Sequence, residues 1–145
     1  MKLVVQRVKY ASVKVDNEVI GSIKEGLMVL IGAKKGDEEK DVDYCVDKLI
    51  NLRIFRDEND KMNLSVKDIN GELLLISQFT LYADTSHGRR PSFVNADDAE
   101  HANMLYEKFI EKAKLSGLKV ETGSFGADMA VELLNNGPVT VIVES

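Results

Sequence analysis

The amino-acid sequence predicts an α+β fold, in which a largely antiparallel, curved or barrel-like β-sheet is accompanied by two α-helices. Apolar runs of strand length recur along the chain, and hairpin-length links join most of them. Two longer segments carry apolar residues at helical spacing instead. The order is strands, helix, strand, helix, strands, which favours helices packed on a sheet. Because the sequence has no repeat, linker or low-complexity tract, residues 1–145 are predicted to form a single domain.

The chain opens with three predicted strands. Lys2–Tyr10 is rich in valine, and Ser12–Val15 alternates strictly between polar and apolar residues. Asp16-Asn17 supplies turn chemistry before the next strand, Glu18–Ile23. Gly26–Gly32 is apolar throughout and bracketed by glycines. A strand this apolar must be covered on both faces or lie inside a barrel.

The first helix follows these strands. Asp37 is predicted to be its N-cap, and Glu38 and Glu39 suit the positive end of the helix dipole, with Arg53 at the other end. Cys45 is expected in the core, because it belongs to the apolar face of this helix and free cysteine is commonly buried. One apolar face is formed by Val42, Cys45, Val46, Leu49 and Ile50.

The stretch Glu72–Tyr82 is the next predicted strand, and it contains unusual polar residues. Its apolar run continues into Ser77, Gln78 and Thr80 before apolar character resumes. A buried hydroxyl or amide without a partner costs a few kcal/mol, so each must be hydrogen-bonded or exposed in a cleft. Two interpretations stay open from the spacing: these residues satisfy backbone groups at a strand end, or they line a site.

Two segments are predicted to be loops, and a second helix follows the later one. The charged segment Arg56–Lys61 and the segment Ala83–Asn95 are the loops. The helix is expected to start near Asn95 or Asp97 and to end at Gly117. Its apolar stripe is formed by Ala102, Leu105, Tyr106, Phe109, Ile110 and Ala113.

The C-terminal part predicts three short strands. They are Leu118–Gly123, Met129–Leu134 and Pro138–Val143, and Asn135–Gly137 is expected to form a hairpin turn between the last two. Pro138 must sit at a strand start or on an edge, because proline cannot donate to a sheet ladder. A preceding glycine permits a cis peptide or an unusual backbone angle. The spacing alone favours a plain turn, since only ~5–6% of X–Pro bonds are cis.

Composition excludes several classes of protein. An apolar fraction of 44% and a charged fraction of 30% are ordinary for a globular protein, and no apolar run approaches membrane-helix length. A single cysteine and the lack of a signal-peptide pattern predict a cytoplasmic protein. The net charge of −5 argues against a large surface for non-specific binding of nucleic acid, although it is compatible with a local basic patch.

The sequence offers no standard catalytic constellation. No His, Cys or carboxylate residues have metal-ligand spacing, so we expect neither a metal nor another cofactor. There is no G-x-S-x-G elbow and no phosphate-binding glycine loop. His87 lies in a loop beside two arginines, and His101 faces away from the apolar stripe of its helix. The hydroxyl groups have no evident activating partner. If the protein is an enzyme, electrostatic stabilisation of the transition state by backbone groups is therefore expected to carry much of the catalysis.

Five segments in register resemble the D-aminoacyl-tRNA deacylases, also called D-tyrosyl-tRNA deacylases. The paired signature is Ser77–Thr80 with Asn136–Thr140. Val5–Val8, Gly88–Phe93 and Phe125–Met129 also match in order and spacing. The resemblance covers essentially the whole chain, so it implies the fold of that family and a single deacylase domain.

The resemblance implies a homodimer that hydrolyses the ester joining a D-amino acid to the 3′-terminal adenosine of tRNA. It also implies release of glycine from mischarged tRNA and rejection of L-aminoacyl-tRNA. The pocket would be completed across the subunit interface, with Met129 and Arg7 as supporting residues. One chain would contribute Ser77, Gln78, Phe79 and Thr80, and the other Gly137 and Pro138.

The same resemblance implies a mechanism based on backbone groups. Backbone amides around Phe79 and Thr80 would hold the ester, and the ribose 2′-hydroxyl of the substrate would assist. Only the tRNA end would enter the pocket, so a small basic rim suffices. The candidates for this rim are Lys34, Lys35, Arg89 and Arg90.

Two other classes of function remain as alternatives. A non-catalytic module that binds RNA ends or small ligands could use the same fold, since fold does not determine function. A general esterase with a Ser or Thr nucleophile would form a covalent acyl-enzyme.

Overall fold

The computed structural model describes every residue from Met1 to Ser145. None of its helices is long and apolar enough to cross a membrane. The elements in chain order are β1 (Lys2–Val15), β2 (Glu18–Ile23), β3 (Gly26–Gly32), α1 (Glu39–Asn51), β4 (Phe55–Arg56), β5 (Met62–Leu64), β6 (Glu72–Ser77), the 3₁₀ helix η1 (Phe79–Tyr82), α2 (Ala99–Lys114), β7 (Val120–Thr122) and β8 (Ala130–Glu144).

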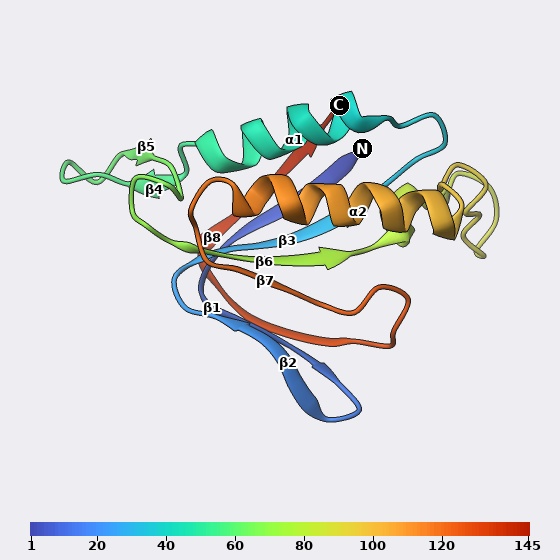
Figure 1. The fold of residues 1–145 in the computed structure, drawn as a ribbon, viewed down its shortest axis with the longest axis horizontal. Helices are drawn as coiled ribbons and strands as arrows, with labels where there is room; N and C mark the ends of the chain where they lie inside the picture. The colour runs from blue at the N-terminus through green and yellow to red at the C-terminus, as the bar shows by residue number, and fades with distance from the viewer.

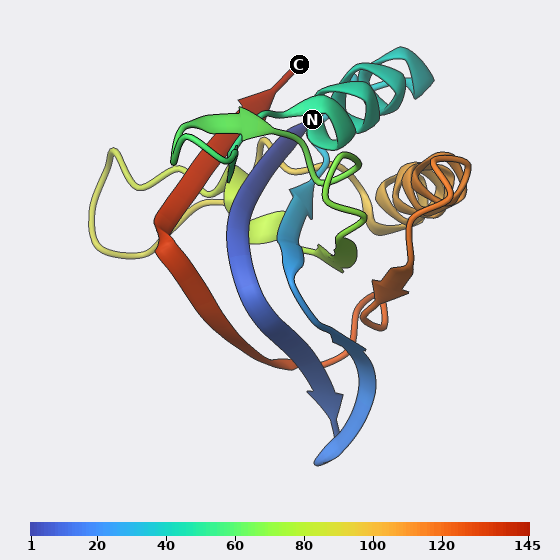
Figure 2. The ribbon, with the colours of Figure 1, turned by 90° about the vertical axis from the view of Figure 1, so that its left-hand side faces the viewer.

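The main sheet is strongly curved, and β1 is its central strand (Figures 1 and 2). The strand order is β2-β1-β3-β6-β7. β3 and β2 pair with successive parts of one edge of β1, and β8 pairs with its opposite edge. All pairings of β1 are antiparallel, whereas β6 pairs parallel to both β3 and β7. The predicted α+β fold with a largely antiparallel curved sheet and two helices is confirmed. The parallel pairs follow from the helices, because α1 and α2 are the crossovers that parallel neighbours require.

Both faces of the sheet are covered, as the apolar strands predict. Along β6, Leu73 and Leu75 belong to the larger core, which lies between the sheet and the two helices. Leu74 and Ile76 belong to a smaller core on the opposite face. Successive side chains of a strand point to opposite faces, so a strand serving two cores must be apolar throughout. Both helices lie on the same side of the sheet in Figure 1.

Helix α1 begins one residue later than predicted, and the prediction of Asp37 as its N-cap is wrong. Glu38 is the N-cap and forms a reciprocal capping box with Asp41. The carboxylate of Asp37 is buried and accepts hydrogen bonds from the Met1 ammonium and the Lys34 N–H, each at 2.8 Å. Cys45 lies in the core as predicted, and burial raises the pKa of its thiol to about 11.

Helix α2 also begins later than predicted, at Ala99. Asp98 is its N-cap and accepts the N–H of His101. The preceding residues are held extended beside the end of β3, since Asp97 N–H donates to the Ala33 carbonyl and Lys34 pairs with Ala96. These tertiary hydrogen bonds shift the first residue of α2 toward the C-terminus, and no local sequence pattern predicts them.

The strand predicted over Glu72–Tyr82 ends at Ser77, so the second half of that prediction is wrong. The N–H of Gln78 still donates to the Ile31 carbonyl at 2.7 Å. The chain then turns into η1, where Leu81 N–H donates to the Gln78 carbonyl and Ala83 N–H to the Thr80 carbonyl.

The hairpin predicted at Asn135–Gly137 is also wrong, because β8 runs through it as one strand. β8 pairs with β1 on both sides of this point, but the register shifts. Between the pairs Gln6–Thr140 and Val8–Asn135, residues 136–139 of β8 face Arg7 alone, which makes a wide bulge. Pro138 therefore lies on an edge strand, as predicted, and its bond to Gly137 is cis. The predicted loop Arg56–Lys61 lies mostly in the exposed turn between β4 and β5.

The two-core arrangement makes a stability prediction at Leu75. This side chain is fully buried in the larger core, so Leu75→Ala is expected to lower the free energy of unfolding by about 2–5 kcal/mol. Leu115→Ala is the matched control, because Leu115 is 87% exposed and should change it by no more than about 0.5 kcal/mol. Denaturant unfolding of both variants measures the difference, and equal effects would contradict the assignment.

Candidate active site

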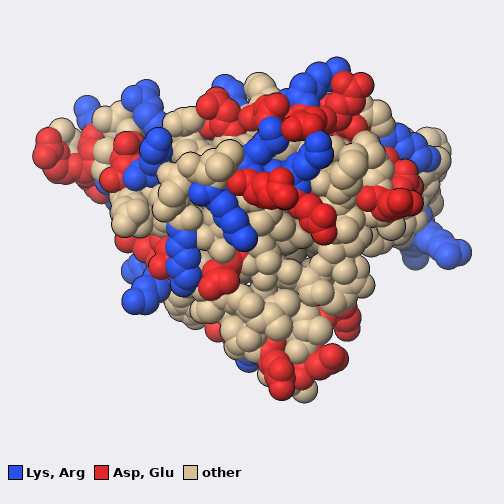
Figure 3. All heavy atoms as spheres, in the orientation of Figure 1, with Lys and Arg blue, Asp and Glu red and all other residues tan.

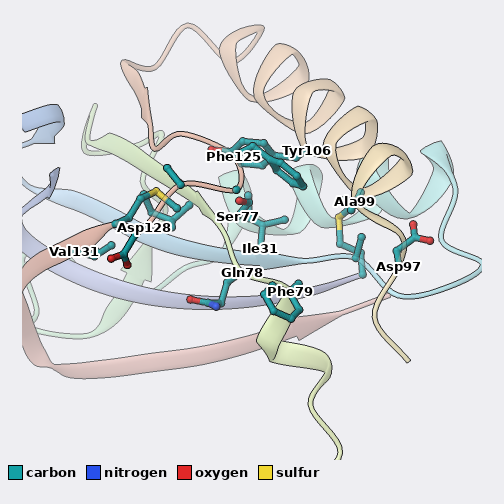
Figure 4. A pocket seen from close by; sticks show the side chains of 17 residues that line it. Ile31, Ser77, Gln78, Phe79, Asp97, Ala99, Tyr106, Phe125, Asp128 and Val131 are labelled. Atoms are coloured by element: carbon teal, nitrogen blue, oxygen red, sulfur yellow. The ribbon is translucent and has the colours of Figure 1, made fainter. Parts of the chain in front are cut away.

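A cavity of about 550 Å³ opens beside the end of β6 (Figure 4). One wall is the junction of β6 and η1, a second is the start of α2, and a third is the segment 125–131. Twelve of the 17 lining residues are hydrophobic, so the cavity suits an apolar group with few polar contacts.

Four of the predicted site residues line this cavity. They are Ser77, Gln78, Phe79 and Met129. Thr80 does not line it: the residue is exposed, and its Oγ1 accepts a hydrogen bond from Gln78 Nε2 at 2.6 Å. Ser77 and Gln78 therefore lie at a cleft, which for these two residues favours the second of the two interpretations that the spacing left open.

Two backbone donors begin η1 at this junction. The N–H groups of Phe79 and Thr80 have no partner inside η1, whereas Gln78 N–H donates to the Ile31 carbonyl and Leu81 N–H to the Gln78 carbonyl. The first N–H groups of any helix lack partners inside it. Unpaired donors at a strand end can stabilise a developing oxyanion.

Aromatic rings form two contacts around the cavity. Phe79 is 56% exposed and meets Phe93 edge to face, with ring centroids 5.0 Å apart. Tyr106 and Phe125 lie together on the α2 side, 6.1 Å apart (Figure 4). The Tyr106 hydroxyl donates to the Leu75 carbonyl at 2.7 Å, and burial raises its pKa to about 12. Tyr106 is therefore a protonated structural donor and no general base at neutral pH.

Neither histidine lines the cavity. His101 is bonded through Nδ1 to the Asp97 carboxylate, and that bond raises the pKa of His101. His87 contacts Ser86 in the exposed loop after η1. Ser77 has no side-chain hydrogen bond to either of them, so the site lacks the nucleophile–base pair of a serine or threonine esterase.

Arg7, Gly137 and Pro138 lie away from this cavity, at the bulge of β8. The Arg7 guanidinium is buried and donates from Nε to the Asn136 carbonyl at 2.8 Å and from Nη1 to the Ile54 carbonyl at 2.6 Å. Gly137 has a φ of +141°, and a Cβ there would come within 2.9 Å of Arg7 Nη2. Within one chain, Arg7 supports the Gly137-Pro138 bulge, and the bulge does not reach the chain's own cavity.

The four predicted basic residues lie on two segments, the end of β3 and the loop after η1. Lys34 pairs with Ala96, and Lys35 N–H donates to the Asn95 carbonyl at 3.2 Å, which ties the end of β3 to the loop after η1. Arg89 and Arg90 are exposed in that loop. In Figure 3 basic side chains project where this loop lies, at the right of the view, whereas acidic and basic side chains interleave over the helices.

Comparison with known proteins decides the family. The family model described as D-Tyr-tRNA(Tyr) deacylase matches residues 4–144. The chain belongs to this family. A D-aminoacyl-tRNA deacylase of Clostridioides difficile is 58% identical over the whole chain and 97% of its own length, and one of Aquifex aeolicus is 57% identical over the whole chain and 98% of its length.

Two solved structures share the fold of this chain. A protein described as the c-Myc DNA unwinding element binding protein has a TM-score of 0.94 and 42% identity, over 100% of this chain and 99% of its own. A probable eukaryotic D-amino acid tRNA deacylase has a TM-score of 0.84 over 99% and 98% of the two chains. At 16% identity, this second likeness speaks for the fold alone.

Sequence reasoning missed part of the cavity lining. Phe125, Ala127 and Asp128 line it, although the segment that holds them was matched only as a motif without a role. Tyr106 was assigned to the core stripe of α2, and nothing in its spacing distinguishes a cavity wall from a core position. No group of three or more His, Cys, Asp or Glu residues is arranged to hold a metal ion.

Proposed function

We propose how this member of the deacylase family hydrolyses the ester of D-aminoacyl-tRNA. Its membership makes it a hydrolase that removes the D-aminoacyl group from tRNA. The proposed site is the cavity at the end of β6, and its catalytic groups are the N–H donors of Phe79 and Thr80, which have no partner inside η1. The observation that carries the proposal is this pair of donors at a cavity that neither histidine lines.

The chemistry proceeds at the ester carbonyl. The backbone N–H groups hold the carbonyl oxygen and stabilise the negative charge that develops when water adds to the carbon; one such donor is worth about 10²–10³ in kcat. The bond to the ribose oxygen then breaks, releasing the amino acid as its carboxylate and restoring the 3′-hydroxyl of tRNA. The neighbouring 2′-hydroxyl of the substrate assists, in place of a histidine base.

Ser77, Gln78 and Met129 line the cavity and position the aminoacyl group. The cavity is mostly apolar, with room for side chains of different sizes, so it does not select one amino acid by shape. Gln78 also holds the Thr80 hydroxyl at 2.6 Å, which orients the start of η1.

Chiral selection is assigned to Gly137 and Pro138 of a second subunit, acting by exclusion. Rigid main chain placed where an L side chain would project rejects all L residues at once. Glycine has no side chain to collide, so glycyl-tRNA is expected to be discharged too. Arg7 supports this wall through the Asn136 carbonyl.

A homodimer is required, because Gly137 and Pro138 lie outside their own chain's cavity. The bulge stands on β8, whose outer edge pairs with no strand of the chain. Apolar side chains are exposed along β8, including Leu134 at 45% and Ile142 at 64%. A long apolar edge strand left open to water is a liability that a two-fold interface removes.

The tRNA end is the macromolecular partner. The rim formed by Lys34, Lys35, Arg89 and Arg90 would meet its phosphates, which is compatible with a net charge of −5 if few phosphates are contacted. The cytoplasm, where aminoacyl-tRNA is used, is the expected compartment.

Matched D- and L-aminoacyl-tRNA test the proposed function directly. The enzyme should discharge the D substrate in catalytic excess and leave the L substrate intact. A non-catalytic binding module would instead protect D-aminoacyl-tRNA from hydrolysis. A general esterase would accumulate a covalent acyl-enzyme and would not need the terminal 2′-hydroxyl of tRNA.

Thr80→Ala is expected to retain a substantial share of activity, because Thr80 acts through its backbone N–H. The loss in kcat should stay within about tenfold, and Thr80→Ser should lose less. Steady-state deacylation of D-aminoacyl-tRNA measures both, with Thr85→Ala in the exposed loop as the control. A loss of ~10⁴ would identify the hydroxyl as a nucleophile and refute the backbone mechanism.

The shared site also predicts the mass of the active species. Light scattering at the concentration of the assay should give twice the 16.1 kDa of the chain. A fully active sample with the mass of one chain would refute a site completed by a second subunit.

Gly137→Ala is expected to weaken rejection of the L substrate. The new Cβ would lie 2.8 Å from Val139 Cγ2 and 2.9 Å from Arg7 Nη2, so the bulge must move. Discharge of L-aminoacyl-tRNA should rise by about tenfold or more relative to the D substrate, the factor that ~1.4 kcal/mol gives. Gly117→Ala is the control, since it too has a positive φ but no atom within 4 Å of the new Cβ. Unchanged selectivity in a folded Gly137→Ala dimer would contradict the exclusion mechanism.

A further inference from the structure

A second cavity, of about 510 Å³, is bordered by Asn136 and Gly137 of the β8 bulge, and most of its charged side chains are basic. β1 contributes Arg7 and Lys9, β4 contributes Arg56, and Gly137 forms part of the wall. The one carboxylate that lines it is Glu25, which makes no ion pair with any of the three cations. Three cationic side chains thus face one carboxylate across a polar hollow.

Arg7 is the unusual member of this set. It is 4% exposed, yet no carboxylate lies within 4 Å of its guanidinium. Nε and Nη1 each donate to a backbone carbonyl, whereas Nη2 has no hydrogen bond within the chain. Buried charges are normally paired, and a guanidinium with unused donors matches the oxygens of a phosphate.

The other two cations can turn toward an anion at little cost. Lys9 is exposed and has no salt bridge. Arg56 pairs with Asp60 at 2.7 Å, but both side chains are more than half exposed, and pairs of this kind are weak. Burial and the neighbouring Arg56 both lower the pKa of Arg7, which a bound anion would reverse.

We propose that the Arg7–Lys9–Arg56 cavity binds a backbone phosphate near the 3′ end of the tRNA. The inference rests on the proposed function, in which Gly137 borders the cavity of the partner subunit. Gly137 also lines the Arg7–Lys9–Arg56 cavity, so this cavity lies next to the residue that the proposal places at the aminoacyl end of the tRNA. A chain of net charge −5 repels RNA, so cations concentrated at this point would hold the strand. This cavity is separate from the rim of Lys34, Lys35, Arg89 and Arg90.

The test compares substrates with and without phosphates. kcat/KM is measured for D-aminoacyl-tRNA and for the same D-aminoacyl ester of adenosine, which has no phosphate. The double variant Lys9→Gln/Arg56→Gln should lower the tRNA-to-adenosine ratio of kcat/KM by about tenfold, mainly through KM for tRNA. It should also reduce the slope of log(kcat/KM) against log[salt] for tRNA by about 0.7, the value for one phosphate of a single strand. Arg53→Gln is the matched control: Arg53 is exposed, bonds Asn63 and lies outside the cavity, so the ratio should not change.

Each other result overturns the inference. An equal loss on both substrates would mean that the substitutions act by moving Gly137. Binding of inorganic phosphate that the double variant abolishes, with an unchanged tRNA-to-adenosine ratio, would mark a free-phosphate site. Wild-type protein that hydrolyses neither substrate would refute the proposed function itself, and the inference would fall with it.

Discussion

The antiparallel pairing of β1 with β8 is the constraint on which the rest of the structure depends. β1 is hydrogen-bonded along both edges, to β3 and β2 on one side and to β8 on the other. Its buried residues contribute to both cores, with Leu3 and Val5 in the larger and Val13 in the smaller. The one large irregularity of this ladder lies opposite Arg7, where four residues of β8 face one of β1. Because both strands are held on either side of that point, the extra residues can only project outward.

Arg7 gives this projection a defined shape. Its guanidinium occupies the space behind the bulge, and its bond to the Asn136 carbonyl satisfies a backbone group that the ladder leaves unpaired. Only glycine fits at position 137, because any Cβ would meet Arg7 and Val139. The segment is therefore stiff main chain with little side chain, which suits a surface that must exclude groups rather than bind them.

The cavity at the end of β6 lies where the pairing of β6 with β3 stops. β6 is parallel to both of its neighbours, and its ladder with β3 ends at the pair Ile31–Ser77. Beyond that pair η1 folds on local bonds, and the N–H donors of Phe79 and Thr80 have no partner inside it. The junction thus supplies hydrogen-bond donors without any titratable side chain. This agrees with a site whose histidines lie outside the cavity lining and whose tyrosine is held protonated.

The sequence by itself determined the strands, the two helix faces and the residues that interrupt them. These features are periodic or compositional, so apolar spacing reports them directly: the β6 run serves two cores, and Cys45 lies on the buried face of α1. Ser77 and Gln78 stood out because polar groups after such a run need a partner or a cleft. Tertiary structure alone decided how the elements end and pair. The Asp37 carboxylate, which local rules predict to cap α1, instead binds the buried Met1 ammonium. Hydrogen bonds to the end of β3 hold the residues before α2, so that helix begins later than predicted. Pairing with β1 keeps β8 extended across the Asn135–Gly137 segment that local rules predict to be a turn. In each case a long-range hydrogen bond or ion pair outweighed a local preference of about 1 kcal/mol, and such partners cannot be read from neighbours in the chain.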